Sequence, residues 1–313
     1  MHRPAPRSHS DPQAGQWGGY SVVVVTWQCA GELGRLVASM GLHLGEGVEL
    51  VVVDNASDDD PESAARAWTK GPVEFVALDR NAGFGAASNE GVRRAGGDVV
   101  VLLNPDSELV DGSLGDLAAE ARRRRAIVGP RLLEADGSVQ PSAEGPPVGI
   151  WPWVGALVPG AVQPPFLAAR TEPWRLERSV EVSWLTGACL AAPRDLLLGL
   201  GPFDERIELY GEDMDLGLRA REAGVASWFC PDMARVVHHG AASTSRRYDE
   251  DERAALKARN RRTAIRRAHG ARAERRAWRA DHVRFGLRAA AKRALRRDPA
   301  RDRRDLRALR RAR

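Results

Sequence analysis

Residues 20–27 read YSVVVVTW and residues 49–55 read ELVVVDN. Both are short runs of β-branched residues without polar alternation, a pattern typical of strands buried on both faces of a parallel sheet. The first run reaches Thr26 and the second ends at Asp54 and Asn55. The two segments therefore predict an α/β protein in which polar side chains follow the ends of buried strands.

The same pattern continues along the chain, with strands expected at 73–78 and 98–103. Helical stretches at 32–40, 61–68 and 85–95 separate the four strands, and proline at the start of the second favours the first turn of a helix. Alternating strands and helices indicate a mostly parallel central sheet flanked by helices on both faces. Ligands of such sheets bind beyond the carboxyl ends of the strands. We therefore expect Thr26, Asp54 and Asn104-Pro105-Asp106 to share one binding edge.

The second half of the chain is less regular. Residues 140–175 are rich in Pro, Gly and Trp, which predicts a long irregular loop of the kind that is often functional. An apolar stretch follows at 182–192, helical spacing returns at 212–223, and a further strand is expected at 225–229. We divide the chain into a disordered leader (1–18), an α/β domain (19–245) and a basic helical tail (246–313) broken at Pro299.

Charge is distributed very unevenly. From residue 253 to 313 there are 24 Lys and Arg against 5 Asp and Glu, which leaves 23 basic and 37 acidic residues in the rest of the chain. The three cysteines are too far apart for a disulfide framework, so a reducing compartment fits best. The leader lacks the apolar core of a signal peptide, and no apolar run reaches the ~20 residues needed to cross a bilayer. These features predict a cytoplasmic protein.

The basic tail has two interpretations. An arginine-rich helix from Arg253 onward could bind nucleic acid, but Trp278 and Phe285 are the only aromatic residues there for base stacking. Ala, Leu and Arg at helical spacing, including Leu287 and Leu295, better fit a helix over 253–297 that lies on an anionic membrane surface. We expect no nucleic acid as partner, although a nucleic-acid-binding protein remains the alternative from a different class.

Two polar clusters follow the predicted strands. Asp54 could accept hydrogen bonds from a nucleoside, or its neighbours could simply form a turn and a helix cap. Asp106 could ligate a divalent cation bound to a diphosphate, or Asn104-Pro105-Asp106 could be an ordinary turn. The segment NAGFGAASN at 81–89 lacks the third glycine of a dinucleotide fingerprint and follows the third strand rather than the first.

Two further clusters lie in the second half. Glu212 and Asp213 stand at a predicted helix start, where carboxylates either stabilise the helix dipole or supply a general base. Asp215, two positions after Asp213, points to a different side of that helix. His238 and His239 follow an apolar stretch and are either metal ligands or surface residues.

In order, these segments resemble the family 2 glycosyltransferases, with particular similarity to bacterial rhamnosyltransferases that act on N-acetylglucosaminyl-diphospho-polyprenol. The resemblance covers residues 20–245. It rests on eight motifs in the family's order: VVVVTW, VVVDNASDDD, RNAGFGAASNEG, VVLLNPDSEL, DGSVQPSA, WLTGACLAAPRDLL, FDERIELYGEDMDLGLRAREAG and VVHHGAAST.

The resemblance implies a GT-A fold and a role for each matching residue. Thr26 and Asp54 would hold the nucleoside, with Arg80 and Asn81 beside the donor. Asn104-Pro105-Asp106 matches the family's metal-binding Asp-x-Asp element, in which Asn104 here replaces the first aspartate. His238 matches the metal ligand, with His239 as the alternative, and Asp213 matches the catalytic base. Trp184, Gly187 and Glu212 would lie on the acceptor side.

The implied activity is an inverting, metal-dependent hexosyl transfer that uses Mg²⁺ or Mn²⁺. The favoured donor is dTDP-β-L-rhamnose, and the favoured acceptor is a polyprenyl-diphosphate-linked GlcNAc of cell-wall assembly at the inner face of the plasma membrane. A different nucleotide sugar, or an exopolysaccharide or glycolipid acceptor, remains the alternative within the class.

Overall fold

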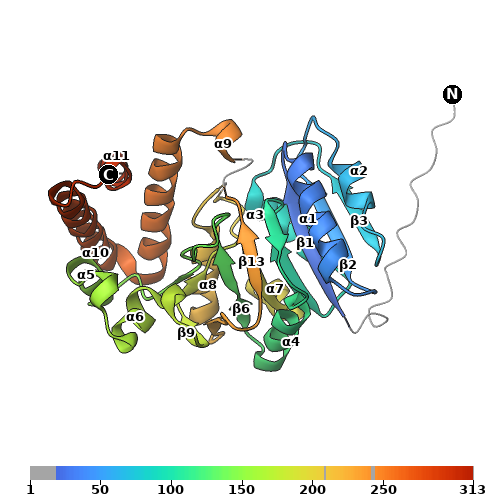
Figure 1. Cartoon of the computed structure of the whole chain (residues 1–313), viewed down its shortest axis with the longest axis horizontal. Helices are drawn as coiled ribbons and strands as arrows, with labels where there is room; N and C mark the ends of the chain where they lie inside the picture. The colour runs from blue at the N-terminus through green and yellow to red at the C-terminus, as the bar shows by residue number, and fades with distance from the viewer. Residues whose placement is uncertain (1–18, 208, 241–243, 313) are drawn as a thin grey trace.

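The computed structural model describes residues 19–207, 209–240 and 244–312. A sheet with helices on both faces forms one side of the molecule, and a group of helices from the C-terminal part of the chain forms the other (Figure 1). The leader predicted at 1–18 lies outside the described residues. Within them, no helix combines the length and the apolar composition that crossing a bilayer would require.

The first part of the chain folds as the sequence predicts. Four strands alternate with three helices: β1 (Tyr20–Thr26), α1 (Ala30–His43), β2 (Glu49–Asp54), α2 (Pro61–Arg66), β3 (Val73–Ala77), α3 (Phe84–Arg94) and β4 (Val99–Leu103). Helix α2 starts at a proline and is capped by the side chain of Asp60, which accepts a hydrogen bond from the Ser63 N–H. The valine-rich strands are almost completely buried, as expected for the centre of a covered sheet.

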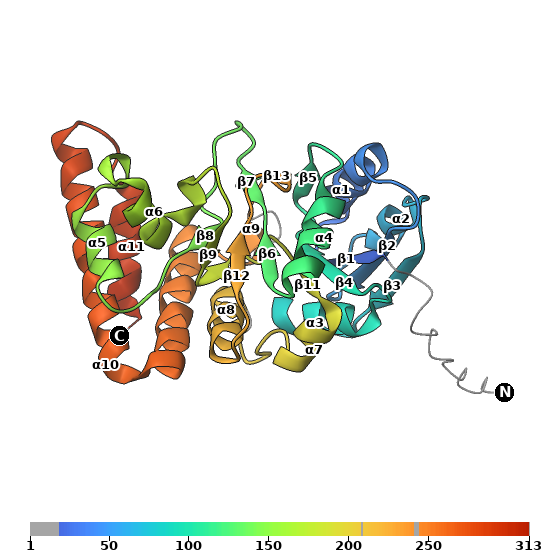
Figure 2. The same ribbon diagram turned by 90° about the horizontal axis from the view of Figure 1, so that it is seen from below.

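The central sheet has eight strands in the order β3-β2-β1-β4-β11-β6-β12-β9 (Figure 2). Its later strands are β6 (Ile127–Gly129), β9 (Val180–Val182), β11 (Cys189–Pro193) and β12 (Ser227–Phe229). Strand β11 runs antiparallel to its neighbours β4 and β6, and β9 is antiparallel to β12, while the other pairs are parallel. The predicted α/β fold with a mostly parallel sheet is confirmed.

Side chains from two sets of helices fill the core. One face of the sheet packs against α1, α2 and α4 (Leu114–Arg124), and the other against α3, α7 (Arg194–Leu200) and α8 (Glu212–Glu222). Two small sheets complete the domain. One joins β5 (Ser107–Leu109), β13 (Arg235–His238) and β7 (Arg131–Leu133), and the other pairs β8 (Ala143–Glu144) with β10 (Trp184–Leu185).

The prediction of an irregular loop at 140–175 is wrong. The segment contains strand β8, helices α5 (Trp151–Leu157) and α6 (Pro165–Thr171), and short 3₁₀ turns at 160–162 and 173–175. Its helices are short and carry prolines in their first turns, so they show little helical periodicity in sequence. They form because α5 packs against α10, a helix that begins some ninety residues later.

The C-terminal part is helical and packs against the rest of the protein. It contains α9 (Thr244–Arg247), α10 (Glu250–Ala294), which is kinked at Gly270, and α11 (Ala300–Arg311), which follows Pro299. Helix α10 contacts α5, α8 and α11. Several of its arginines form ion pairs with acidic residues of the body, including Arg267 with Asp215 at 2.8 Å and Arg288 with buried Glu172 at 3.1 Å. Part of the tail's positive charge is therefore neutralised within the fold.

Candidate active site

The carboxyl ends of β1 and β2 bring Thr26 and Asp54 together. The two residues are register partners in the parallel pair, and the Thr26 hydroxyl donates to Asp54 Oδ1 at 3.1 Å. Asp54 Oδ2 accepts from the Ser57 N–H at 3.0 Å, and Ser57 Oγ also donates to the carboxylate. The carboxylate is buried and fixed, as a group that recognises a nucleoside needs to be.

The next loop is tied to the same edge. Asn55 Oδ1 accepts from the Ala82 N–H at 2.7 Å, and Asn81 Oδ1 accepts from the Gly83 N–H at 3.0 Å just before α3 begins. Arg80 is exposed beside them. The turn that follows β3 is therefore attached to the end of β2, which places Asn81 near Asp54.

Asp106 and His238 meet because β5 pairs with β13. Asp106 directly precedes β5, His238 ends β13, and the pairing sets His238 opposite Ser107. His238 Nε2 lies 3.4 Å from Asp106 Oδ1 and 3.2 Å from Asn104 Nδ2. His239 turns to exposed Glu108 instead, at 3.3 Å. The structure thus brings the side chains of Asn104, Asp106 and His238 together, whereas His239 contacts Asp106 through its backbone N–H.

These residues fit a divalent cation. A carboxylate oxygen suits Mg²⁺ or Mn²⁺, whereas an imidazole nitrogen favours a transition-metal ion and therefore Mn²⁺ over Mg²⁺. His238 Nδ1 lies 2.8 Å from Gln140 Oε1. A hydrogen bond at Nδ1 leaves Nε2, the nitrogen that faces Asp106, free to bind a metal ion. No cluster of three or more His, Cys, Asp or Glu side chains occurs in the described part of the chain. Diphosphate and water oxygens would therefore have to complete the coordination.

Asp213 stands in the first turn of α8. Its Oδ2 accepts from the Gly187 N–H at 3.2 Å, and its Oδ1 accepts from the Met214 N–H at 2.7 Å. The residue after Gly187, Ala188, accepts a hydrogen bond at 2.9 Å from the Asn104 N–H. Two consecutive residues of one segment therefore hold both Asp213 and the Asn104–Asp106 turn, which links the two carboxylates across a short stretch of backbone.

The neighbouring carboxyls have unusual acidities. Burial raises the pKa of Asp213 above its ordinary value, against the lowering effect of the Met214 and Gly187 N–H groups and of Lys257. Burial and, next, the charge of Asp213 raise the pKa of Glu212 to about 8. The buried Glu212 Oε2 has no hydrogen-bond partner among the described residues. A carboxylate of raised pKa is a stronger proton acceptor, which suits a general base.

Asp215 has a structural role. It is buried and pairs with Arg219 and Arg267 at 2.7 and 2.8 Å. Its side chain therefore points away from the site, as the helical spacing predicts.

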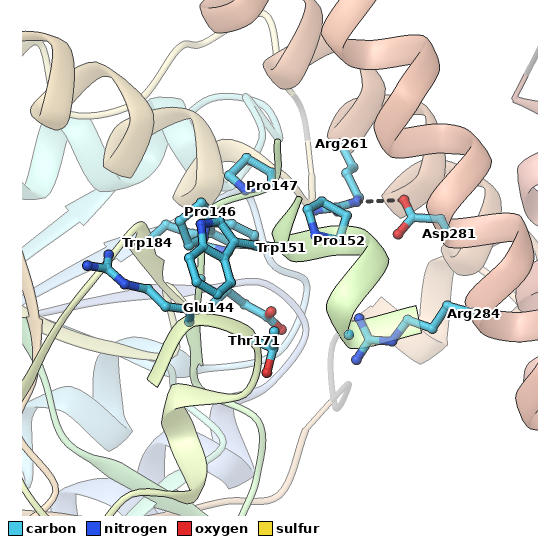
Figure 3. A pocket seen from close by; sticks show the side chains of 13 residues that line it. Glu144, Pro146, Pro147, Trp151, Pro152, Thr171, Trp184, Arg261, Asp281 and Arg284 are labelled. Atoms are coloured by element: carbon cyan, nitrogen blue, oxygen red, sulfur yellow. Dashed lines mark hydrogen bonds and ion pairs between the residues drawn. The ribbon is translucent and has the colours of Figure 1, made fainter. Parts of the chain in front are cut away.

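Trp184 packs against α8, beside Met214 and Gly217, and against Arg261 of α10. It lines a small cavity between β8, α5 and α10, together with Trp151, Arg261 and Arg284 (Figure 3). The cavity measures about 30 Å³, which is room for roughly one water molecule. Gly187, by contrast, is in contact with Asp213 and the Phe84 ring. Of the three residues expected on the acceptor side, Gly187 and Glu212 adjoin Asp213, and Trp184 packs against both α8 and α10.

Sequence reasoning missed several residues that shape the site. Ser57 holds Asp54, Gln140 orients His238, and Asn260 of α10 donates to the carbonyls of Leu209 and Tyr210 just before α8. Gln140 belongs to one of the motifs that carry the resemblance, but its spacing gives no sign of a partner. Asn260 carries no local signal at all.

Comparison with known proteins shows the family to which the chain belongs. The glycosyl transferase family 2 model matches residues 21–147. The N-acetylglucosaminyl-diphospho-decaprenol L-rhamnosyltransferase of Mycobacterium tuberculosis is 35% identical over 250 residues, which cover 72% of this chain and 77% of that protein. The chain belongs to glycosyl transferase family 2. An O-antigen biosynthesis protein of Myxococcus xanthus is 32% identical to this glycosyltransferase over 62% of the chain but only 15% of its own length.

Solved structures show the fold of the glycosyltransferase. The mannosyltransferase PcManGT of Pyrobaculum calidifontis, in complex with GDP-Man and Mn²⁺, aligns with a TM-score of 0.56 and 19% identity over 94% of this chain and 85% of its own. Staphylococcus aureus TarS 1–349, in complex with UDP-GlcNAc, aligns with a TM-score of 0.54 and 17% identity over 93% and 79%. The chain therefore has the GT-A fold expected from its motifs.

Proposed function

We propose that this glycosyltransferase transfers L-rhamnose from dTDP-β-L-rhamnose, with inversion, to a hydroxyl of GlcNAc linked through diphosphate to a polyprenol. The observation that carries the proposal is a pair of hydrogen bonds at consecutive residues: the Gly187 N–H donates to Asp213, and the Ala188 carbonyl accepts from the Asn104 N–H. They set a candidate base beside a candidate diphosphate site. The acceptor and sugar are those named for the M. tuberculosis relative.

In this proposal the donor lies along the carboxyl edge of the sheet. Thr26 and Asp54 receive the nucleoside, and Arg80 and Asn81 lie beside it. Asp106 and His238 would hold Mg²⁺ or Mn²⁺, which when bound supplies positive charge that offsets the charge on the departing diphosphate.

Asp213 then removes the proton from the acceptor hydroxyl while that oxygen attacks the anomeric carbon. The new C–O bond forms as the bond from the anomeric carbon to the nucleoside diphosphate breaks on the opposite face. One displacement inverts the centre, so the β-linked donor gives an α-L-rhamnoside, and the proton remains on Asp213 until it passes to solvent.

The tail supports a position at a membrane. Leu287 of α10 and Leu295, the first residue after that helix, are exposed. Both lie among arginines, as in helices that bind anionic lipid surfaces. We extend the proposal to contact between residues 253–297 and the inner face of the plasma membrane. Flotation with liposomes should recover more protein with anionic lipid than with neutral lipid, and equal recovery would remove this part.

The test of the function is direct. The protein is incubated with GlcNAc-diphosphate on a short alkyl chain and, in separate reactions, dTDP-rhamnose, UDP-GlcNAc or GDP-mannose, each with and without Mn²⁺. We expect a product heavier by one rhamnose only with dTDP-rhamnose and metal, and an α-anomer by its one-bond C–H coupling. If only another donor supports transfer, the sugar of that donor replaces rhamnose in the proposal. A β-linked product would exclude an inverting mechanism.

A further inference from the structure

One face of α10 lies along the segment that leads into α8. Arg253, Lys257, Asn260 and Arg261 occupy positions i, i+4, i+7 and i+8, which share a face of a helix. Asn260 Nδ2 lies 2.9 Å from both backbone oxygens that it contacts, those of Leu209 and Tyr210. The Arg261 guanidinium lies 5.9 Å from the centre of the Trp184 ring. This face of the tail is therefore oriented toward the proposed base.

Lys257 brings a positive charge to that position. Its Nζ lies 4.5 Å from the centre of the Tyr210 ring, three residues before Asp213. The charge lowers the pKa values of both Glu212 and Asp213, so it acts on both carboxyls. Crowding by protein lowers the pKa of Lys257 although the side chain is still exposed.

Two arginines accompany Lys257. Arg253 lies one turn earlier on α10, and its Nη1 is buried with no hydrogen-bond partner among the described residues. Arg301 of α11 is exposed, and Arg253 and Arg301 both lower the pKa of Lys257. Asp305 is the acidic residue of α11 that faces them, and burial raises its pKa. We call Arg253, Lys257 and Arg301 the α10–α11 cation cluster. Its buried donor without a partner, Arg253 Nη1, favours an anionic ligand.

We propose that the α10–α11 cation cluster, formed by Arg253, Lys257 and Arg301, binds the diphosphate of a lipid-linked acceptor and thereby holds the acceptor sugar beside Asp213. The proposal rests on the proposed function and adds the site of acceptor recognition. The candidate donor diphosphate site is at Asp106 and His238, beyond the Gly187–Ala188 segment from Asp213. We assign the cluster to a second diphosphate because Lys257 lies against Tyr210, in the segment that leads to Asp213. Guanidinium groups suit a diphosphate because they bind phosphate oxygens in pairs.

The test compares two acceptors that differ only in charge: octyl GlcNAc-diphosphate and octyl GlcNAc without phosphate. For Lys257→Gln and Arg253→Gln we expect kcat/KM with the diphosphate acceptor to fall about tenfold or more, mainly through KM. With the neutral acceptor we expect little change for Arg253→Gln and a smaller loss for Lys257→Gln than with the diphosphate acceptor, because the Lys257 charge also acts on Asp213. The affinity of both variants for dTDP should be unchanged. A tenfold loss corresponds to about 1.4 kcal/mol. The matched control is Arg259→Gln, which removes one charge from an exposed position on the same helix and should behave as wild type.

Three results would overturn the cluster's role. These are an equal loss with both acceptors, an equal preference of the wild type for the two acceptors, or a weakened affinity of the variants for dTDP. If the wild type transfers no sugar at all, the proposed function fails separately, and calorimetric binding of octyl GlcNAc-diphosphate then decides. If Lys257→Gln binds octyl GlcNAc-diphosphate more weakly than Arg259→Gln does, the result supports the anion site. Equal binding by the two variants would contradict it.

Discussion

The site has two parts that are built differently. The donor half, around Thr26, Asp54 and Asn104, is formed by the ends of strands. The base half, around Asp213, is stabilised by hydrogen bonds from α10, a helix later in the chain. Thr26, Asp54 and Asn104 each end or follow a strand of the central sheet, and β1 lies between β2 and β4. Asp213 stands at the start of α8, and the residues before it are hydrogen-bonded to Asn260 of α10. The donor half therefore depends on sheet register, while the base half depends on packing between parts of the chain far apart in sequence.

This difference separates two kinds of substitution. A change in the donor half should weaken binding of the nucleotide, because its residues are expected to contact the nucleoside and the diphosphate. A change in the base half should leave nucleotide binding intact and slow the transfer. The following predictions use that contrast, beginning with the largest effect.

Asp213→Asn should lower kcat for transfer by roughly 10²–10⁴-fold, the usual contribution of a general base. Asn keeps the size of the side chain but cannot take the proton. Affinity for dTDP, measured by calorimetry, should be unchanged. The matched control is Glu222→Gln, an exposed carboxylate at the other end of α8, which should retain wild-type activity. A weaker affinity for dTDP in Asp213→Asn would contradict the separation of the two halves.

Gln140→Leu should weaken Mn²⁺ binding in the presence of dTDP by roughly 10–100-fold, as loss of a residue that orients a metal-binding histidine commonly does. Without Gln140 the His238 ring loses its partner at Nδ1. Mn²⁺ affinity can be followed by electron paramagnetic resonance. His239→Ala is the comparison, because that ring faces Glu108, and it should bind Mn²⁺ like the wild type. An equal loss of Mn²⁺ affinity in the two variants would contradict the role of His238 as a metal ligand.

Asn260→Ala should destabilise the protein by roughly 1–3 kcal/mol, since two backbone carbonyls lose their hydrogen bonds. Because those carbonyls belong to Leu209 and Tyr210, transfer should slow several-fold while dTDP affinity stays constant. Thermal unfolding and steady-state rates measure both effects, with Arg259→Ala as the exposed neighbour for control. A variant with full activity would show that α10 does not position the base half.

The smallest effect concerns pH. The rate should fall as pH decreases through the raised pKa of the Glu212–Asp213 pair, because the base must be deprotonated. Glu212→Gln removes the neighbouring charge, so the fall should occur at lower pH than in the wild type. The variant should also gain stability relative to the wild type as pH rises above about 4.5. The raised pKa of about 8 keeps Glu212 protonated in the folded wild type at pH values where the unfolded chain has already released that proton. Folding of the wild type therefore becomes less favourable over this range.

A rate profile that does not move in Glu212→Gln would show that the two carboxyls titrate independently. The thermal comparison provides a second measurement. The difference in Tm between variant and wild type should narrow at pH 4, where Glu212 is neutral in both folded and unfolded chains. A constant difference across the pH range would instead point to packing as its cause.

Much of the donor half was predictable. The valine-rich runs marked the strands, and a parallel sheet aligns the carboxyl ends of its strands, so Thr26 and Asp54 had to be neighbours once their register was set. The pairing of β5 with β13, which joins Asp106 to His238, could not be seen in segments so short. Helices α5 and α6 were missed because short helices with prolines in the first turn show little periodicity in sequence. The packing of α5 against α10 cannot be read from the sequence.

The sequence by itself determined the α/β class, the polar strand ends and, through its motifs, membership in a family that transfers sugars. These features are local or ordered along the chain, so periodicity and motif order report them. Only the tertiary structure placed the basic tail against the body, with Asn260 and Lys257 beside the residues that lead into α8. The composition of an arginine-rich helix is the same whether its charges face lipid, nucleic acid or buried carboxylates. Which partner each charge has is decided by packing across the whole fold.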